Sequence, residues 1–418
     1  MKRLTALLLF LFLFSEYSSA IDKKDFDKYF KLLPRPKKIE LLNGPGISYN
    51  TLQSIVLKGT GKPVLNGILK SLPLSNKEGN GVLVLTISTE NGLPDSDEGY
   101  IINIKSNSVM IRARANAGLF YGSQTLLQLL EDAHDQKIVI PACTITDYPD
   151  IAYRAVHLDL KHHLDAGHYY YEMIDRLAAI KINAIIVEFE DKLRYKKAAA
   201  VGAPDAISVE EFASISRYAK ERNIEISPLV QGLGHASFIL KHEEYKKLRD
   251  DPASDWSFDP LNPDTYDLQF SLYQDAIDAT PFGKYLHVGG DEVGDLGKSE
   301  LAKKSGLTPI QLQMRWLQRV CEFAKAHNRI PIFWDDMVFK LAGVYQSTWD
   351  PDVPVDKVIK TWKENSHLLD ENINLFPKEC IYMRWNYDDP SLPGNLKAIE
   401  WYKSHDLKVM AATAAQTM

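Results

Sequence analysis

The stretch "KYLHVGGDE", residues Lys284–Glu292, joins a short apolar run to two glycines and two adjacent acids. An apolar run of this length that ends at Gly-Gly predicts a short strand buried in a sheet. The glycines allow a sharp turn directly after the strand, because glycine accepts backbone angles that other residues avoid. Asp291 and Glu292 are therefore predicted to follow a buried strand, and two adjacent like charges at such a place need a chemical reason.

Six further runs of the same kind lie on either side of this stretch. They are "YRAVHLDL", "INAIIVEFE", "IEISPLVQ", "IPIFWDD", "CIYMRWNY" and "LKVMAATA". Segments of helical spacing separate them, and two of these begin with capping patterns, Ser208 with Glu211 and Thr308 with Gln311. Repeated strand–helix units predict an α/β fold with a parallel sheet, and seven units in about 265 residues fit a (β/α)8 TIM-type barrel better than an open doubly wound sheet.

Seven strand candidates are one short of a closed eight-stranded barrel, and no closing helix follows the last of them. We therefore expect the eighth strand to lie beyond Met418 and the natural chain to continue. An open parallel edge leaves backbone groups unpaired. A protein that ends at Met418 is accordingly expected to aggregate or to be inactive.

The region before the barrel divides into two parts. Residues 1–20 combine Lys2 and Arg3 with an apolar run and a small-residue site at Ser18 and Ala20, which is the pattern of a cleaved secretory signal peptide. The run is short for a membrane span, although an uncleaved membrane anchor remains the alternative. We expect cleavage after Ala20 and export to the periplasm or the extracellular space.

Residues 21–147 have the pattern of a small α+β domain, and the barrel then occupies residues 148–418. The alternation in "GVLVLTIS" and "GYIINIKSNSVMIRAR" predicts half-buried strands, and "NAGLFYGSQTLLQLLEDA" has the spacing of a covering helix. No residue of this first domain suggests catalysis.

The composition of the 418 residues, with 45% hydrophobic residues and a formal net charge of -6, is that of a globular protein with room for two domains. The absence of a basic block argues against nucleic acid as a partner. The cysteines, Cys143, Cys321 and Cys380, match no zinc motif and are expected to be free and mostly buried. No cofactor and no metal are predicted, although the clustered histidines His157, His162, His163 and His168 leave a metal site as an alternative.

Polar and aromatic residues recur where the predicted strands end, which in a barrel of this kind is the position of the active site. The candidates are Arg154, His157, Asp159, Glu188, Glu190, Asp191, His235, His287, Asp291, Glu292, Trp334, Asp335, Asp336, Arg384, Trp385, Tyr387 and Asp388. Carboxylates that bind hydroxyls and aromatic rings that pack on C–H faces suit a sugar. Each also has a structural alternative: Trp334 and Trp385 as barrel core, and Arg154 as part of an ion pair.

The segment "HVGGDE" resembles the H-x-G-G-D-E signature of family 20 glycoside hydrolases, the β-N-acetylhexosaminidases. The segments "RAVHLDLK", "VEFED" and "ISPLVQGLGHASFILKHEEYKKLRD" are similar to the hexosaminidase D branch of that family. The segment "ARANAGLFYGSQTLLQLL" is similar to the small α+β domain that precedes many family 20 barrels. The resemblance covers nearly all of the chain after the predicted signal peptide.

This resemblance implies substrate-assisted hydrolysis, in which the 2-acetamido group of the sugar replaces an enzyme nucleophile. Glu292 would serve as general acid and then as general base, and Asp291 would hold the acetamido group while an oxazolinium ion forms. One carboxyl must then be protonated and its neighbour charged, which gives the adjacent acids a chemical reason.

The resemblance also implies a set of sugar-binding residues. These are Arg154, His235, Glu190, Asp191, Trp334, Trp385 and Tyr387, with His287 as a supporting residue. The second strand ends in "EFED", where better-known members carry histidine and aspartate, so the substrate preference is expected to differ. The family's last strand supplies a further tryptophan, and the sequence ends before it.

The function expected from these features is an exo-β-N-acetylhexosaminidase that releases terminal β-linked GlcNAc or GalNAc from glycans. One alternative is a glycan-binding protein on the same barrel with little or no activity. Another is a metal-dependent hydrolase that uses His235, His287 and Asp291. Turnover of a chromogenic N-acetylhexosaminide would argue against the glycan-binding protein. Loss of activity with chelators would support the metal-dependent hydrolase.

Overall fold

The computed structural model describes residues 23–59, 81–161, 163–294, 296–387 and 389–414. The predicted signal peptide and the site of its cleavage lie outside these residues. Contacts within the chain divide it into two compact units. One comprises Met1–Arg154, Glu172–Asn183 and Glu221–Asn223, and the other comprises Ala155–Tyr171, Ala184–Lys220 and Ile224–Met418.

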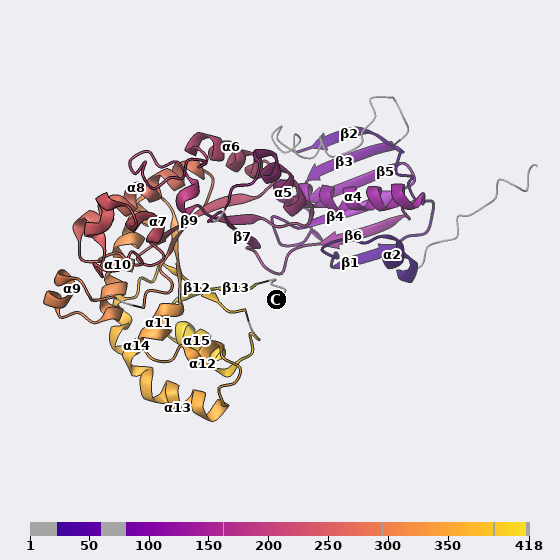
Figure 1. Ribbon diagram of the computed structural model, residues 1–418. Coiled ribbons are helices and arrows are strands. Elements are labelled where there is room, and N and C mark those ends of the chain that lie inside the picture. Colours follow the sequence, from indigo (N-terminus) through magenta and orange to yellow (C-terminus); the bar gives the residue numbers. More distant parts are fainter. Residues whose placement is uncertain (1–22, 60–80, 162, 295, 388, 415–418) are drawn as a thin grey trace, which may run out of the picture. The chain divides into compact units, whose positions relative to one another are not determined.

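The first unit contains a six-stranded mixed sheet with the order β1-β6-β4-β5-β3-β2. Its elements are α2 (Lys23–Tyr29), β1 (Lys38–Leu41), β2 (Leu52–Lys58), β3 (Gly81–Ile87), β4 (Tyr100–Lys105), β5 (Ser108–Ala113), α4 (Asn116–Gln136) and β6 (Cys143–Asp147). Helix α4 lies across one face of the sheet (Figure 1). Burial alternates along β3 and β6, as the period of two in their sequences predicts. The unit is therefore a small α+β domain, as expected.

The second unit is built on seven parallel strands that are neighbours in chain order. They are β7 (Ala155–Asp159), β8 (Ala184–Glu188), β9 (Glu225–Gly232), β10 (Tyr285–Gly289), β11 (Ile330–Trp334), β12 (Ile381–Trp385) and β13 (Lys408–Ala412). Each strand lies where an apolar run predicted it. The sheet is curved, with helices between successive strands (Figure 1), and its fold class is the TIM-type barrel.

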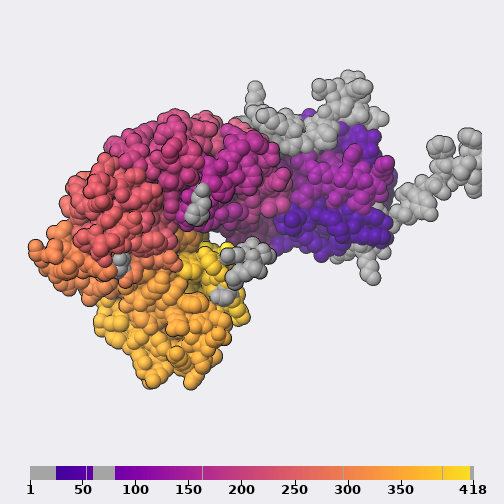
Figure 2. Space-filling view, viewed as in Figure 1, coloured from indigo at the N-terminus to yellow at the C-terminus, as the bar shows by residue number. Residues whose placement is uncertain are grey.

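The connections between these strands are helical almost throughout. They comprise α5 (Gly167–Ala179), η1 (Glu190–Lys192), α6 (Val209–Lys220), α7 (Ser237–Leu240), η2 (Glu243–Leu248), α8 (Pro263–Ala279), α9 (Glu300–Ser305), α10 (Pro309–Ala326), α11 (Asp336–Leu341), α12 (Gln346–Trp349), α13 (Val355–Asn365), α14 (His367–Asn372), η3 (Ile373–Leu375) and α15 (Pro393–Ser404). In the space-filling view these connections, from α6 to α15, form most of the visible surface of the unit (Figure 2).

Both predicted helix caps are present. Thr308 and Gln311 form a complete capping box at the start of α10. The Ser208 hydroxyl accepts the N–H of Glu211 over 3.2 Å at the start of α6. These contacts satisfy backbone N–H groups that have no partner inside the helix.

The interior of the sheet is apolar. Side chains from β8, β9, β11 and β12 meet there, namely Ile186, Leu229, Ile332, Trp334 and Met383. The cysteines are free and buried, as predicted. Among the described residues, no helix is long and apolar enough to cross a membrane.

Candidate active site

The turn after β10 depends on its two glycines. Gly289 and Gly290 have φ angles of 68° and 92°, in the left-handed region that glycine favours. A Cβ on Gly289 would lie 2.1 Å from Gln231 Oε1, and one on Gly290 would lie 2.5 Å from the ring of Phe333. Only glycine therefore fits both the angles and the space, and the turn puts the two acids just beyond the carboxyl end of the strand.

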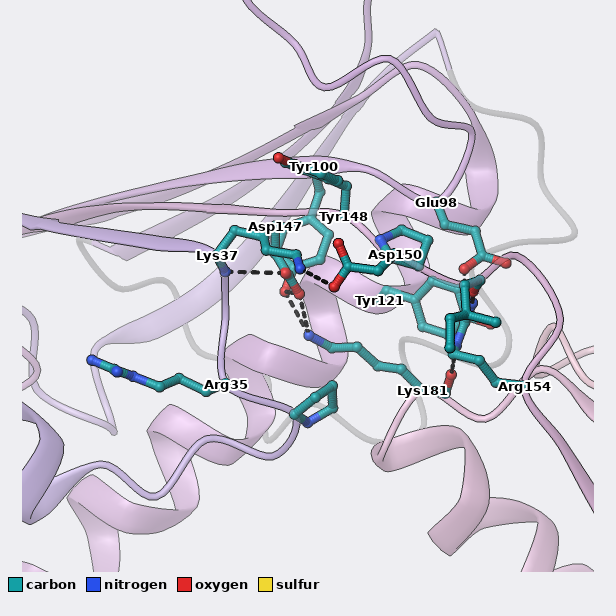
Figure 3. Close-up of a pocket in the computed structure, with 13 residues that line it drawn as sticks. Arg35, Lys37, Glu98, Tyr100, Tyr121, Asp147, Tyr148, Asp150, Arg154 and Lys181 are labelled. Carbon is teal, nitrogen blue, oxygen red and sulfur yellow. Dashed lines mark hydrogen bonds and ion pairs between the residues drawn. The ribbon is translucent and has the colours of Figure 1, made fainter. Parts of the chain in front are cut away.

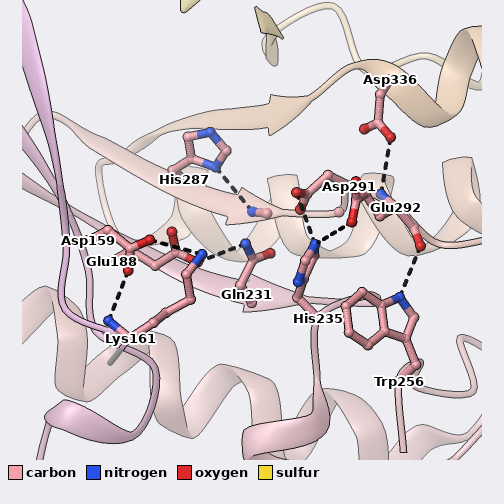
Figure 4. Close-up of polar contacts among 12 residues, drawn as sticks. Asp159, Lys161, Glu188, Gln231, His235, Trp256, His287, Asp291, Glu292 and Asp336 are labelled. Carbon is pink, nitrogen blue, oxygen red and sulfur yellow. Dashed lines mark hydrogen bonds and ion pairs between the residues drawn. The ribbon is translucent and has the colours of Figure 1, made fainter. Parts of the chain in front are cut away.

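A single imidazole nitrogen contacts both acids. Nε2 of His235 lies 3.3 Å from Asp291 Oδ2 and 3.3 Å from Glu292 Oε2 (Figure 4). Burial acts to lower the pKa of His235, but the hydrogen bond with Asp291 and the charges of both carboxylates outweigh it and raise the pKa. His235 follows β9, so the ends of two neighbouring strands supply this group.

Trp256 supports the same group from a loop that follows η2. Its ring lies 4.4 Å from that of His235. Its indole N–H donates to the backbone oxygen of Glu292 over 3.0 Å. The tryptophan therefore fixes both the histidine ring and the peptide of Glu292.

The two acids differ in their access to solvent. The side chain of Glu292 is 46% exposed and that of Asp291 is 16% exposed. Asp291 Oδ1 is buried and has no hydrogen-bond partner among the described residues. Glu292 can therefore reach a bound molecule from outside, whereas Asp291 is enclosed with a free acceptor.

A third carboxyl group lies beside this pair. Asp336, in the first turn of α11, accepts the N–H of Glu292 over 3.1 Å and lies 3.3 Å from Lys340 Nζ. Burial raises the pKa of Asp336 to about 7, and the charge of Asp291 adds to this, while Lys340 opposes it.

A second polar group lies at the ends of β7, β8 and β9 (Figure 4). The buried carboxylate of Glu188 lies 3.0 Å from His157 Nε2 and 3.3 Å from Lys161 Nζ, and it accepts the Gln231 amide N–H over 2.9 Å. Burial acts to raise the pKa of Glu188, but these partners outweigh it and hold the pKa at about 2. Glu188 is therefore a charged anchor for Lys161.

Glu190 and Asp191 follow on the short helix η1. Burial and the charge of Glu188 raise the pKa of Glu190 to about 7, and His235 opposes this shift. The charge of Lys161 opposes it more strongly, so the main electrostatic neighbours of Glu190 are Glu188 and Lys161. Asp191 lies 3.6 Å from Lys192 Nζ.

Aromatic rings are supplied by β12 and the residues after it. The rings of Trp385 and Tyr387 lie 5.4 Å apart, and Tyr387 is 60% exposed. Burial raises the pKa of Tyr387, and the charges of Asp291 and Glu292 act in the same direction. Trp385 is half-buried, and its ring lies 6.4 Å from that of Tyr345.

Trp334 lies in the core of the sheet and does not form an exposed surface of the site. Its side chain is 9% exposed and packs in the interior of the sheet, its ring 4.4 Å from that of His287. His287 is fully buried and its Nδ1 accepts the N–H of Gly289. Burial and the charge of His157 lower the pKa of His287 to about 3, so the ring is neutral and carries its proton on Nε2. His287 thus supports the turn after β10.

The prediction that Arg154 binds the sugar is wrong. Arg154 precedes β7 and so lies at the amino end of that strand, opposite the end where the acids stand. Its guanidinium donates to Lys181 O, Ile151 O and a carboxylate oxygen of Glu98, over 2.5–2.9 Å. It lines a pocket of the first unit (Figure 3). Arg154 instead forms a structural ion pair with Glu98, which is the alternative that the sequence left open.

Within the described residues, no group of three or more His, Cys, Asp or Glu side chains is arranged to hold a metal ion. His162, one of the clustered histidines, and Asp388 lie outside the described residues.

Two family models match the chain in succession. "Glycosyl hydrolase family 20, domain 2" matches residues 29–148, and "Glycosyl hydrolase family 20, catalytic domain" matches residues 151–391, which is more than half of the chain.

Similar curated proteins carry related names. Hexosaminidase D of Bos taurus is 29% identical over 192 residues, which cover 44% of this chain and 56% of that protein. Beta-hexosaminidase of Porphyromonas gingivalis is 27% identical over 394 residues, which cover 81% of this chain and 50% of that protein. The chain thus spans about half the length of these relatives.

The fold is also that of solved structures. The GH20 β-N-acetylhexosaminidase from Streptomyces coelicolor A3(2) superposes with a TM-score of 0.67 and 21% identity, over 93% of this chain and 76% of that one. At 21% identity the structural similarity establishes only the fold. The assignment of the chain to a family rests on the two family models. With both models matched in order and the Asp291–Glu292 pair at the end of a barrel strand, the chain belongs to glycoside hydrolase family 20.

Proposed function

We propose that the protein is an exo-acting β-N-acetylhexosaminidase that removes terminal β-linked GlcNAc or GalNAc from glycans. The observation that carries the proposal is the pair Asp291 and Glu292, one enclosed and one half-exposed, joined by His235 at the carboxyl ends of β9 and β10. The names of the similar proteins, hexosaminidases in each case reported above, support it.

The geometry supports a division of labour in the first step. Asp291 accepts the N–H of the 2-acetamido group, and its charge stabilises the positive charge that develops there. The acetamido oxygen attacks the anomeric carbon as the bond to the leaving oxygen breaks, and Glu292 transfers its proton to that oxygen. The sugar becomes a cyclic oxazolinium ion, and no bond to the enzyme forms.

Water completes the reaction in the second step. Glu292, now a carboxylate, takes a proton from a water molecule that attacks the anomeric carbon and reopens the ring of the oxazolinium ion. Two displacements at one carbon retain the β configuration. The first product anomer seen by NMR should therefore be β.

The remaining residues are proposed to hold the sugar. Trp385 and Tyr387 offer neighbouring aromatic faces at the carboxyl end of β12. Lys161, anchored by Glu188, and Glu190 offer a donor and a carboxyl group for sugar hydroxyls at the carboxyl ends of β7 and β8.

A panel of 4-nitrophenyl glycosides tests the proposal. We expect turnover of the β-N-acetylglucosaminide or β-N-acetylgalactosaminide, and a kcat/KM at least about a thousandfold lower for the β-glucoside, because the internal nucleophile is missing. Equal turnover of glucoside and N-acetylglucosaminide would contradict the mechanism. Binding of the acetamido sugars without any turnover would favour the glycan-binding alternative.

A further inference from the structure

The peptide of Glu292 is held on both sides. Its N–H donates to Asp336 Oδ2 over 3.1 Å, and its carbonyl oxygen accepts the Trp256 indole N–H over 3.0 Å. Glu292 has a φ of 52°, a left-handed conformation that costs free energy for any residue with a side chain. Such a conformation persists only where the surroundings hold it, so Asp336 is part of what aims the Glu292 carboxyl.

Asp336 is itself in an unusual position for an acid. It is 1% exposed, in the first turn of α11. The titratable groups that face it are Asp291 and Glu292 after β10, Lys340 on α11, and the neighbouring Asp335 and Tyr345. Lys340 is the cation of this set and is 34% exposed, so solvent weakens its attraction. Asp335 is bound to Arg384 instead.

The hydrogen bonds of Asp336 are incomplete if it is ionised. Oδ2 accepts from Glu292 and contacts Lys340, but Oδ1 is buried without a partner among the described residues, as is Asp291 Oδ1. A buried carboxylate oxygen without a donor is costly. A proton on Oδ1 removes the charge of Asp336 and turns this atom into a donor, while Oδ2 remains free to accept from Glu292.

We propose that Asp336 is a positioning residue for the catalytic pair, which, in its protonated form, holds the Glu292 backbone and leaves Asp291 as the charged carboxyl beside it. This inference rests on the proposed function. Loss of the proton puts two like charges into an enclosed space, and their repulsion favours displacement of the acids. Burial raises the pKa of Asp336 to about 7, which places the change within the range of ordinary assays.

The kinetic test uses Asp336→Asn and Asp336→Ala with a dinitrophenyl N-acetylhexosaminide, whose good leaving group makes the proton of Glu292 nearly dispensable. Wild-type kcat should fall as the pH rises through about 7. The Asn variant, whose amide oxygen still accepts from Glu292 but cannot ionise, should keep its kcat across this range. The Ala variant should lose about tenfold or more of kcat already at pH 6, with a small change of KM.

The pH profile of Asp336→Asn also tests whether ionisation of Glu292, the general acid, causes this pH dependence. Removal of a nearby negative charge lowers the pKa of a carboxyl group. If the alkaline fall reported the ionisation of Glu292, Asp336→Asn would move it to lower pH or leave it unchanged. A fall that stays or moves downwards in the Asn variant, or an Ala variant with wild-type kcat, would overturn the proposal.

A measurement without substrate separates this proposal from the function. A carboxyl group whose pKa is raised in the folded state destabilises the protein as the pH rises from the unfolded to the folded pKa. The Tm of the wild type relative to Asp336→Asn should therefore fall between about pH 4 and pH 7 and stay constant above. Amide exchange at residues 292–294 should be faster in Asp336→Ala than in Asp336→Asn. A Tm difference that does not vary with pH, or equal exchange in both variants, counts against Asp336 even in a protein that shows no turnover.

Discussion

Individual side chains at this site owe their properties to neighbours from other strands. His235 is charged more readily because two carboxylates face one of its nitrogens, and Glu188 stays charged although it is buried because His157 and Lys161 face it. Burial and charge thus act in opposite directions at these residues, and the contacts with oppositely charged groups outweigh burial. Because its pKa is raised, His235 should make the stability of the protein depend on pH.

Substitution of His235 should change how stability depends on pH. The raised pKa of His235 means that its contribution to stability is complete below the unfolded pKa near 6.5 and is lost as the pH rises through the folded pKa. His235→Gln should therefore lower Tm more at pH 5.5 than at pH 9. His168→Gln, at an exposed histidine of α5, is the control and should show no such difference. An equal loss of Tm at both pH values for His235→Gln would disprove the charged contact.

The residues of the site could be predicted in part. Asp291 and Glu292 stand out because a buried strand, two glycines and two acids are contiguous in the sequence. Asp336 and Trp256 could not be assigned a role, since their contacts with Glu292 join positions 44 and 36 residues apart. Arg154 was placed wrongly because the apolar run that contains it does not show that the strand begins at the next residue, Ala155.

At the level of elements, the turn after β10 places the two acids of the proposed mechanism, Asp291 and Glu292. Strands β8 to β12 could be predicted because they are mostly buried, and buried parallel strands are nearly continuous apolar runs. The edge strands β7 and β13 are more exposed, but their sequences are still short apolar runs. The first and last residues of each strand could not be predicted, because adding or removing one residue leaves the apolar pattern unchanged. The glycines after β10 are an exception, because their φ angles are required by the turn itself.

Gly290→Ala should therefore disrupt the turn. The new Cβ would lie 2.5 Å from Phe333, at a φ of 92°, and we expect a loss of about 3 kcal/mol or more in the free energy of unfolding, together with loss of activity. Gly294→Ala is the matched control in the same loop, because nothing lies within 4 Å of its Cβ. It should change stability by about 0.5 kcal/mol or less. Urea unfolding measures both, and equal stabilities would show that the turn does not need Gly290.

At the scale of the whole molecule, the two family models follow each other along the chain, one on the small domain and one on the barrel. The fold class of each unit could be predicted from the alternation of its elements, which is a property of composition and spacing. The activity could not be predicted in this way, because one barrel fold carries many chemistries. It depends on the few residues at the strand ends.

Export is proposed from residues 1–20, and it concerns the whole protein. Expression in a host with a secretory system should yield protein outside the cytoplasm whose N-terminal residue is Ile21 or lies close to it. Edman sequencing or mass spectrometry of the secreted fraction measures this. Recovery in the membrane only, with Met1 and the apolar run intact, would support the membrane anchor instead.

The central claim is that Glu292 serves the leaving group and Asp291 serves the acetamido group. It is tested most directly by kcat/KM of Glu292→Gln and Asp291→Asn on two N-acetylhexosaminides, one with a poor leaving group and one with dinitrophenol. Glu292→Gln should lose about a thousandfold on the poor leaving group and about tenfold or less on dinitrophenol, because general acid help is needed only in the first case. Asp291→Asn should lose similar large factors on both. Equal losses for Glu292→Gln on the two substrates, or a leaving-group dependence seen only for Asp291→Asn, would contradict the account.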